Sequence, residues 1–244
     1  MHVDISPNKQ ELGRRAAAAG AERIRAAIEA RGQANVMVAT GASQFEVLAE
    51  LARSPGIDWG KVDFFHLDDY INMPLTHPAS FRRYLEERLV NKLPAPPKAF
   101  HFLESSNGAE EERRRMGELL ERHPIDVAFI GIGENGHLAF NDPPADFETG
   151  ESYILVSLDD ACRRQQFGEG WFEKLSDVPT RAITISVPQI MKAAAIVCSV
   201  PDLRKAVAVR NAIQGPVTPQ VPASILQRHS QATVFLDTDS ASRL

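Results

Sequence analysis

The sequence predicts a three-layer α/β domain built on a largely parallel sheet. Short apolar segments of strand length alternate with amphipathic segments of helical periodicity along the 244 residues. No internal repeat or low-complexity linker interrupts this alternation. A third observation is the segment 127–142, in which a buried-strand pattern ends in a glycine-rich turn. Strands joined by helices form parallel sheets, so we expect one domain spanning residues 1–244.

The first half of the chain contains four predicted helices and three predicted strands. The helices cover residues 9–31, 44–52, 77–93 and 108–122, and the strands cover residues 35–39, 62–67 and 99–103. The third helix is expected to open at His77-Pro78, because proline is tolerated in a first helical turn. Charges at helical spacing along the fourth helix predict a solvated outer face.

The second half continues the alternation. Apolar runs predict strands at 127–130, 153–158, 181–187, 195–200 and 232–236, and helical segments are expected at 158–171, 202–213 and 222–228. A polar loop rich in proline and glycine occupies residues 143–151. Because such segments bury few contacts, we expect a lid at 143–175.

The segment 129–142 reads FIGIGENGHLAFND and contains the pattern of a dinucleotide-binding turn. Gly131, Gly133 and Gly136 have the G-x-G-x-x-G spacing directly after a predicted strand. That motif needs a helix to begin at the third glycine, so that its N-terminus meets the pyrophosphate. Here two prolines at 143–144 follow closely and leave no room for an ordinary helix. We therefore expect no nicotinamide cofactor at this turn, and the sequence predicts no other cofactor.

Titratable residues follow two predicted strands, at the strand ends where open α/β sheets bind ligands. His137 comes directly after the glycines and Asp142 five residues later, while Asp68 and Asp69 follow the strand at 62–67. Imidazole and carboxylate groups are suited to general acid–base chemistry. Taken singly, each has an ordinary structural alternative: a core histidine, a helix cap or a solvated loop acid. A metal site from these four lacks tight ligand spacing, so no metal is predicted.

A second ligand-binding pattern lies at Thr40-Gly41-Ala42-Ser43, between the strand at 35–39 and the helix at 44–52. Free amides and hydroxyls at a helix start bind phosphate readily. The alternative is an ordinary N-cap, because serine and threonine are favoured there in any case.

Composition excludes several classes of protein. The net charge of -5 provides no basic footprint for nucleic acid. No apolar run is long enough to cross a bilayer. The two cysteines, Cys162 and Cys198, lie in or beside apolar segments and indicate a reducing compartment rather than a disulfide framework or zinc site. The first residues lack the pattern of a signal peptide, so a cytoplasmic location is expected.

Four segments resemble the motifs of the glucosamine-6-phosphate deaminase/isomerase family. They are ATGAS at 39–43, LDDYINMPLTHPASFRRYL at 67–85, GIGENGHLAFND at 131–142 and RKAVAVRNAIQGPVTPQVPASILQRH at 204–229. The resemblance covers nearly the whole chain, in the family's order. The related 6-phosphogluconolactonases share the fold and the glycine turn, but their second motif differs from the LDDY and HPASF found here. The resemblance implies a Rossmann-like α/β sandwich without a dinucleotide.

The resemblance also implies a reaction, in which glucosamine 6-phosphate and water give fructose 6-phosphate and ammonia. Asp68 matches the base that moves a proton between C2 and C1, which suits a carboxylate held close to a carbon acid. His137 matches the residue that opens the pyranose ring, because an imidazole can both accept and donate a proton. Asp142 matches the carboxylate that orients this histidine, and Asn135 belongs to the same catalytic motif.

The ligand implied by the resemblance is a small sugar phosphate. The residues expected to bind the substrate or its phosphate are Thr40, Gly41, Ala42, Ser43, Asp69, Gly136 and Lys205. Such local donors are what an acidic chain needs to bind an anion. A phosphate-binding arginine of the family's lid falls at Gly168, and Arg163 and Arg164 are the candidate replacements.

Two further departures from the family pattern concern the catalytic motif. Family members often have Asp where Asn135 stands, and Asn cannot carry charge. They often have Glu where Asp142 stands, and Asp is one methylene shorter. Three functions therefore remain: the deaminase, a lactonase or isomerase for another hexose phosphate, and a non-catalytic sugar-phosphate sensor. Retention of Asp68 and His137 favours an enzyme. The sequence leaves open both the preferred epimer and assembly into a homo-oligomer.

Overall fold

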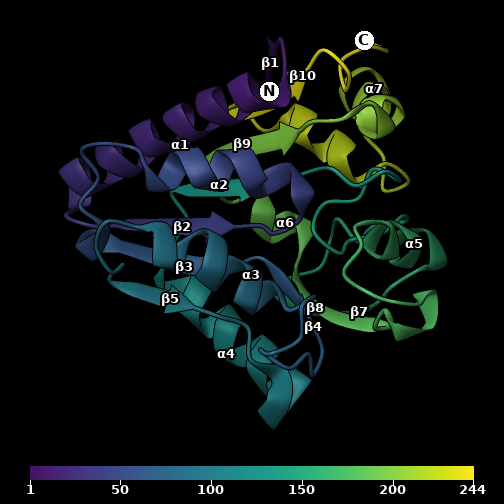
Figure 1. Ribbon diagram of the computed structural model, residues 1–244, viewed down its shortest axis with the longest axis horizontal. Coiled ribbons are helices and arrows are strands. Elements are labelled where there is room, and N and C mark those ends of the chain that lie inside the picture. Colours follow the sequence, from purple (N-terminus) through teal and green to yellow (C-terminus); the bar gives the residue numbers. More distant parts are fainter.

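A seven-stranded parallel sheet forms the centre of the computed structural model, which describes residues 1–244 (Figure 1). The strand order is β1-β10-β9-β6-β2-β3-β5, and each neighbouring pair is parallel. The strands are β1 (His2–Ser6), β2 (Ala34–Val38), β3 (Val62–His66), β5 (Ala99–His101), β6 (Val127–Ile130), β9 (Ala195–Val200) and β10 (Ala232–Asp237). The expected mostly parallel α/β sheet is confirmed.

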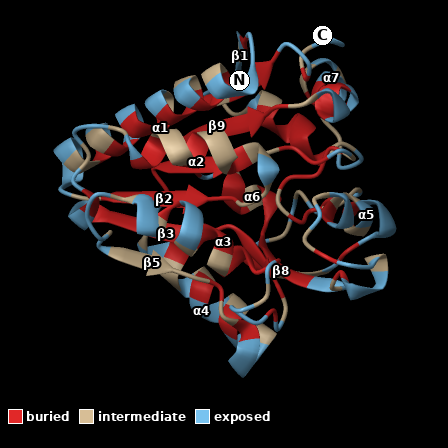
Figure 2. Cartoon of the chain, in the orientation of Figure 1, coloured by how far each residue is buried: buried red, intermediate tan, exposed pale blue.

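Helices cover both faces of this sheet and complete the three layers. They are α1 (Lys9–Arg31), α2 (Phe45–Ala52), α3 (Phe81–Arg88), α4 (Ala109–Arg122), α6 (Val187–Ile190) and α7 (Ala206–Gln214). The remaining helix, α5 (Asp160–Gly168), packs in a third, smaller cluster with Tyr70 and Phe140. Side chains of α1, α2 and α3 pack into one core, and those of α4, α6 and α7 into the other. Val127 and Phe129 of β6 face the first core and Ala128 and Ile130 the second, as the period of a strand requires. Figure 2 shows buried strands between helices whose outer faces are exposed.

A second, three-stranded sheet was not expected from the sequence. It consists of β4 (Asp68–Tyr70), β8 (Arg181–Ile185) and β7 (Tyr153–Ser157), all antiparallel. The strands predicted at 153–158 and 181–187 both lie in this second sheet and not in the parallel one. Their apolar patterns predict strands correctly but do not identify the partner strands.

Leu67 connects the two sheets. Its amide donates to the carbonyl of Val38 in β2 (3.2 Å), and its carbonyl accepts from the amide of Ile185 in β8 (3.0 Å). Leu67 therefore lies between the end of β3 in the main sheet and the start of β4 in the small sheet. The acids that follow it lie where the two sheets meet.

Several helix boundaries differ from the prediction. The third helix begins at Phe81, not at His77, because Ser80 is the N-cap and its hydroxyl accepts from the amide of Arg83. The predicted helix at 202–213 starts as a 3₁₀ turn and becomes α-helical only at Ala206. β1 and α6 were not predicted from the sequence: α6 has only four residues, and in β1 the apolar residues Val3 and Ile5 stand singly between polar ones.

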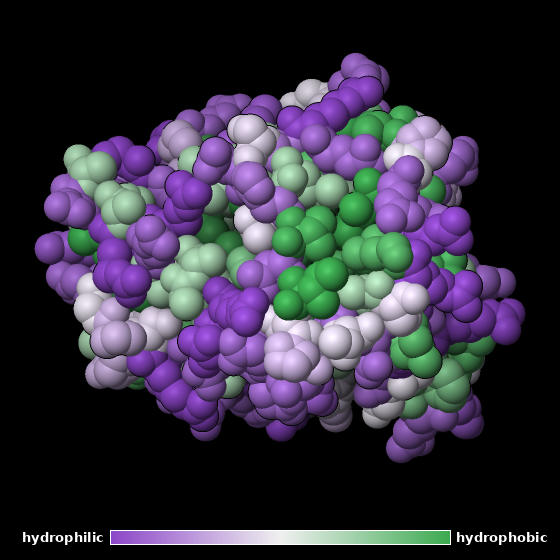
Figure 3. All heavy atoms as spheres, turned by 90° about the horizontal axis from the view of Figure 1, so that it is seen from above, coloured by the Kyte–Doolittle hydropathy of each residue, from purple (hydrophilic) through white to green (hydrophobic).

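The face that carries β1 and α7 has a hydrophobic centre bordered by hydrophilic residues, as the view from above in Figure 3 shows. The exposed large hydrophobic residues of β1 and of the turn into α7 are Val3, Ile5, Leu203 and Val207. None of the helices combines the length and hydropathy that a membrane-spanning segment needs.

Candidate active site

A cavity of about 560 Å³ opens at the carboxyl ends of the central strands. β2 and β6 are adjacent there, with β3 and β5 on one side and β9, β10 and β1 on the other. Strand order therefore reverses between β2 and β6, and open α/β sheets bind ligands at such a point. The wall is built mainly from the segments that follow four strands: 39–43, 67–68, 131–134 with His137, and 201–205.

The glycine turn after β6 presents His137 to this cavity. Gly136 has a φ of 86°, a conformation that favours glycine, and its amide donates to the carbonyl of Gly133 (3.0 Å). The imidazole lies directly against Gly133: a Cβ there would stand 2.3 Å from the Cε1 and Nε2 atoms of His137. Position 133 must therefore be glycine for the histidine to occupy its place. No helix begins after Gly136 until α5, as expected.

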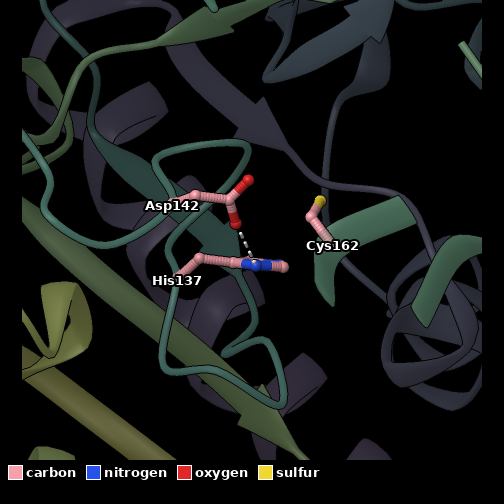
Figure 4. Close-up of side chains that lie close together, drawn as sticks. All are labelled: His137, Asp142 and Cys162. Atoms are coloured by element: carbon pink, nitrogen blue, oxygen red, sulfur yellow. Dashed lines mark hydrogen bonds and ion pairs between the residues drawn. The ribbon is translucent and has the colours of Figure 1, made fainter. Parts of the chain in front are cut away.

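His137, Asp142 and Asn135 form one hydrogen-bonded group, shown in part in Figure 4. The Nδ1 atom of His137 donates to Oδ1 of Asp142 (3.1 Å), and the Nδ2 atom of Asn135 donates to the same oxygen (3.0 Å). The Oδ1 atom of Asn135 accepts from the backbone amide of His137 (3.1 Å). The shorter side chain of Asp142 thus reaches the histidine. Asn135 fixes both members of the pair without carrying charge.

The charge state of Asp142 suits this role. Burial by itself would raise the pKa of this carboxyl, but hydrogen bonds from His137 and Asn135 bring the pKa below its usual range. The amide of Asp159 also donates to Oδ2 of Asp142 (3.4 Å). An ionised Asp142 fixes the imidazole orientation and leaves Nε2 for chemistry, as a carboxylate behind a histidine generally does.

Asp68 lines the cavity from β4 and is 6% exposed. Its carboxylate receives no hydrogen bond from the rest of the chain. Burial, together with the charge of neighbouring Asp69, raises the pKa of Asp68 well above its ordinary value. A buried, unpartnered carboxylate is a stronger base than an exposed one, because ionisation leaves it poorly solvated.

Asp69 points away from the cavity, contrary to its expected role in substrate binding. Oδ2 of Asp69 lies 3.5 Å from Nε of Arg82, which also pairs with Glu104. Burial raises the pKa of Asp69 to about 7, although hydrogen bonds from backbone amides and the charge of Arg82 act to lower it. Successive residues of a strand face opposite sides, so β4 cannot direct both Asp68 and Asp69 into the cavity.

The turn at Thr40–Ser43 forms the opposite end of the cavity, and all four residues line it. Gly41 has a φ of 92°, and its carbonyl accepts both from the amide of Gln44 (3.1 Å) and from the hydroxyl of Tyr84 (2.8 Å). The turn leads into a 3₁₀ segment and then α2, so free backbone amides face the cavity. Such amides bind anions.

Lys205 and Arg204 bring positive charge to the same end. Lys205 is 9% exposed, and its ammonium makes no hydrogen bond or ion pair with another side chain. Burial lowers the pKa of Lys205, and the carboxylates of Glu134 and Glu169 act in the opposite direction. Arg204 pairs with Asp202 (3.0 Å) and lies 3.7 Å from Glu134. A buried cation without a partner is suited to an anionic ligand.

Arg204 and Glu169 were missed in the sequence. Glu169 follows α5 and lines the cavity, and burial raises the pKa of its carboxyl against the charge of Lys205. The expected replacements for the lid arginine do not reach the cavity: Arg163 donates to the carbonyls of Leu175 and Val178, and Arg164 is exposed. Arg204, adjacent to Lys205, is the arginine that lines the cavity.

The structure thus divides the predicted site residues into three groups. Asp68, His137, Lys205 and the turn at Thr40–Ser43 line one cavity. Asp142 and Asn135 lie behind His137 and position it. Asp69 and Gly136 do not line the cavity: Asp69 pairs with Arg82, and Gly136 shapes the turn with its backbone.

Residues 7–235 match the family model described as Glucosamine-6-phosphate isomerases/6-phosphogluconolactonase. The chain belongs to this family. A glucosamine-6-phosphate deaminase from Bacillus cytotoxicus is 34% identical over 243 residues, covering 99% of this chain and 88% of the relative. A deaminase of the same name from Listeria monocytogenes is 36% identical over 218 residues, covering 87% of this chain and 89% of the relative.

Solved structures of the family superpose on this chain. A monomeric glucosamine-6-phosphate deaminase has a TM-score of 0.90 at 26% identity, with both chains fully covered. A 6-phosphogluconolactonase from Trypanosoma brucei has a TM-score of 0.74 at 18% identity, covering 100% of this chain and 98% of its own. At that identity the lactonase shares only the fold. The expected family and its Rossmann-like α/β fold are confirmed.

Proposed function

We propose that this family member is a glucosamine-6-phosphate deaminase, which converts glucosamine 6-phosphate and water to fructose 6-phosphate and ammonia. One observation carries the proposal: a buried carboxylate, Asp68, and an oriented imidazole, His137, line the same cavity as Lys205. Relatives that are named as this deaminase are about one-third identical over nearly the full chain. The phosphate-binding end and the acid–base pair together fit a phosphorylated sugar whose other end reacts.

Ring opening is the step assigned to His137. Asp142 and Asn135 hold the imidazole so that Nε2 is the nitrogen left for the substrate. In this step Nε2 accepts the proton of the C1 hydroxyl and returns a proton to the ring oxygen, and the C1–O5 bond breaks. The product is the open-chain aldehyde, which the isomerisation requires. Positioned proton transfer of this kind contributes typically 10²–10⁴-fold to a rate.

Isomerisation is the step assigned to Asp68. Its carboxylate removes the proton from C2 of the open-chain aldehyde and delivers it to C1, while the C1 oxygen gains a proton and the nitrogen loses one, which leaves a C1 hydroxyl and an imine at C2. Water then adds to C2 and ammonia leaves, giving the ketose. Burial raises the pKa of Asp68, which strengthens it as a base for a weakly acidic carbon.

Binding and closure are assigned to the other end of the cavity. The amides of Thr40–Ser43, the Lys205 ammonium and the Arg204 guanidinium would hold the phosphate. The part of the expected lid that faces the cavity is α5 with the residue after it, which contributes Gln165, Gln166 and Glu169. β7, also inside the expected lid, pairs with β8 over its full length, so we assign the mobile part to residues after 158. All of these residues belong to one chain.

Ammonia release is the decisive measurement. The purified protein should release ammonia from glucosamine 6-phosphate and form an equal amount of fructose 6-phosphate. It should not hydrolyse 6-phosphogluconolactone at a comparable rate. Lactone hydrolysis without ammonia would establish the lactonase alternative. Tight binding of the sugar phosphate without turnover of either compound would establish the sensor.

A further inference from the structure

A thiol lies beside the paired histidine and carboxylate, and the reaction does not use it. Cys162, in the first turn of α5, is 1% exposed. One ligand atom from each of Cys162, His137 and Asp142 lies within 4.8 Å of the other two. Figure 4 shows the sulfur facing the imidazole and carboxylate from across a gap, on a different segment of the chain.

We propose that His137, Asp142 and Cys162 form an inhibitory binding site for Zn²⁺. Zinc takes sulfur, imidazole nitrogen and carboxylate oxygen as ligands, and three protein ligands with one open position are common for it. Ligand atoms around tetrahedral zinc lie roughly 3.3–3.8 Å from one another, given bond lengths of about 2.0–2.3 Å. Because the three atoms lie within 4.8 Å of one another, the longest separation must shorten by at most about 1–1.5 Å.

The charges of the three groups fit a divalent cation. Asp142 is ionised, and Cys162 would lose its proton to solvent when the ion binds, as thiol ligands do. Burial, and then the charge of Asp142, raise the pKa of the Cys162 thiol, so it is protonated without the ion. One carboxylate and one thiolate would neutralise Zn²⁺ in a buried place, where an unpaired charge is costly.

The surroundings orient the ligands before an ion binds. Asn135 and the amide of Asp159 hydrogen-bond the two oxygens of Asp142. The side chain of Asp159 in turn accepts from the amide of Cys162 (2.6 Å) and caps α5. Outer contacts of this kind fix ligand geometry and strengthen metal binding. His137 lines the cavity, so the ion has a route from solvent.

Occupation of this site would block the enzyme in two ways. An ion on Nε2 would occupy the nitrogen assigned to the proton transfer, and an ion on Nδ1 would displace the hydrogen bond to Asp142 that orients the ring. The ion also ties α5 to the loop that follows β6, which holds the lid segment in place. This inhibitory effect rests on the proposed function, whereas binding of the ion does not. Mg²⁺ and Ca²⁺ prefer oxygen ligands and should not compete.

Spectroscopy of the metal-free protein tests the site directly. Co²⁺, a spectroscopic substitute for Zn²⁺, should produce a sulfur-to-cobalt charge-transfer band in the near-ultraviolet, with one ion per chain. Zn²⁺ should abolish the band, and excess Mg²⁺ should not. Cys162→Ser should lack the band and bind Zn²⁺ at least about tenfold more weakly in calorimetry, since even outer contacts contribute roughly 10–100-fold. Cys198→Ser, which alters the other buried cysteine, should retain the band.

Three results would overturn the proposal: no band in the wild-type protein, a band that persists in Cys162→Ser, or an equal Zn²⁺ affinity in the wild-type protein and Cys162→Ser. If Cys162→Ser fails to fold by circular dichroism, Cys162→Ala replaces it. Inhibition is measured separately, as ammonia release with and without Zn²⁺ and with excess chelator. A protein that binds Co²⁺ through sulfur but releases no ammonia would retain the metal site and refute the deaminase.

Discussion

The carboxylate of Glu169 lies over the Cα of Gly41, with Oε2 3.8 Å from the point that a Cβ at position 41 would occupy. Gly41 belongs to the turn whose amides are proposed to bind phosphate. Burial raises the pKa of Glu169, and the nearby charge of Lys205 acts in the opposite direction. A carboxylate therefore occupies the anion-binding end when no substrate is bound. Substrate phosphate must displace Glu169 or bind beside a like charge.

Glu169→Gln should lower KM for the sugar phosphate. Removing one like charge near a phosphate is worth on the order of 1 kcal/mol, which corresponds to about fivefold in KM. Affinity for inorganic phosphate should rise in parallel, measured by calorimetry. Glu173→Gln removes an exposed carboxylate from the same region and should change neither value. An increase in KM for Glu169→Gln would show that Glu169 helps substrate to bind.

Asp68→Asn should lower kcat by roughly 10²–10⁴-fold, the usual contribution of a general base, with little change in KM. The amide cannot accept the C2 proton. The neighbouring variant Asp69→Asn is the matched control, because Asp69 faces Arg82 and not the cavity. It should retain far more activity. Steady-state kinetics of both variants decide the matter: more than a tenth of wild-type kcat in Asp68→Asn would refute its role as base.

The same variant should make the fold more stable at neutral pH. Burial raises the folded-state pKa of Asp68, so below its unfolded pKa of about 3.9 the acid is protonated in both states and has no effect. As pH rises above that value, the Asp68 carboxyl ionises first in the unfolded state. The wild type therefore loses stability until the pH passes the folded-state pKa of Asp68.

Melting temperatures measure this difference. The gain of Asp68→Asn over wild type should be larger at about pH 7 than at about pH 4, because the folded-state pKa of Asp68 is raised and the wild type loses stability above the unfolded pKa of about 3.9. Glu121→Gln, an exposed acid on α4, should show no such difference. A gain that is the same at both pH values would mean that ionisation of Asp68 does not oppose folding.

Gly133→Ala should reduce kcat although it removes no polar group. The new Cβ would stand 2.3 Å from the imidazole, so His137 must move from its place beside Asp142. We expect a loss of at least about tenfold, since displacement by about 1 Å can cost 10²-fold. Gly150→Ala introduces the same methyl group where nothing lies within 4 Å. That control should have wild-type kcat, and equal kcat in both variants would contradict the packing argument.

Lys205→Ala should raise KM for the sugar phosphate about 10–150-fold, because a charge-assisted hydrogen bond contributes about 1.5–3 kcal/mol. Its ammonium has no partner in the chain, so no other hydrogen bond or ion pair is lost. Lys192→Ala removes an exposed lysine and should leave KM unchanged. Initial rates over a range of substrate concentrations suffice. If KM for Lys205→Ala equals the wild-type value, the phosphate binds elsewhere.

Strand and helix periodicity identified most of the fold because each element is amphipathic or buried in a regular way. The small sheet was missed for a physical reason: an alternating pattern specifies a strand but not its neighbour. The same missing information about strand pairing explains why Asp69 was expected to bind substrate. Had Asp68–Tyr70 been predicted as a strand, alternation alone would have placed Asp68 and Asp69 on opposite faces.

The site was predicted in part. His137 and Asp68 follow strands, so their positions depend on the local chain. Arg204 lies in the 3₁₀ turn that follows β9, beside the predicted Lys205, and Glu169 reaches the cavity through the packing of α5, which a single sequence does not specify. The only local sign near Glu169 is its position between Gly168 and Gly170. No sequence pattern pointed to Cys162, because its proposed role comes from its position beside His137 and Asp142 in the fold.

The backbone bonds of Leu67 bear on how this enzyme can evolve. Asp68 stands on the small sheet and His137 in the loop that follows β6 of the main sheet. The two sheets are joined beside Asp68 by main-chain hydrogen bonds of Leu67 with Val38 and Ile185. No exchange of side chains removes those bonds, short of proline. The residues that line the sugar side of the cavity can therefore change by mutation while Asp68 keeps its position. New substrate preferences are accessible to this scaffold through α5 and the residues around it, without rebuilding the acid–base pair.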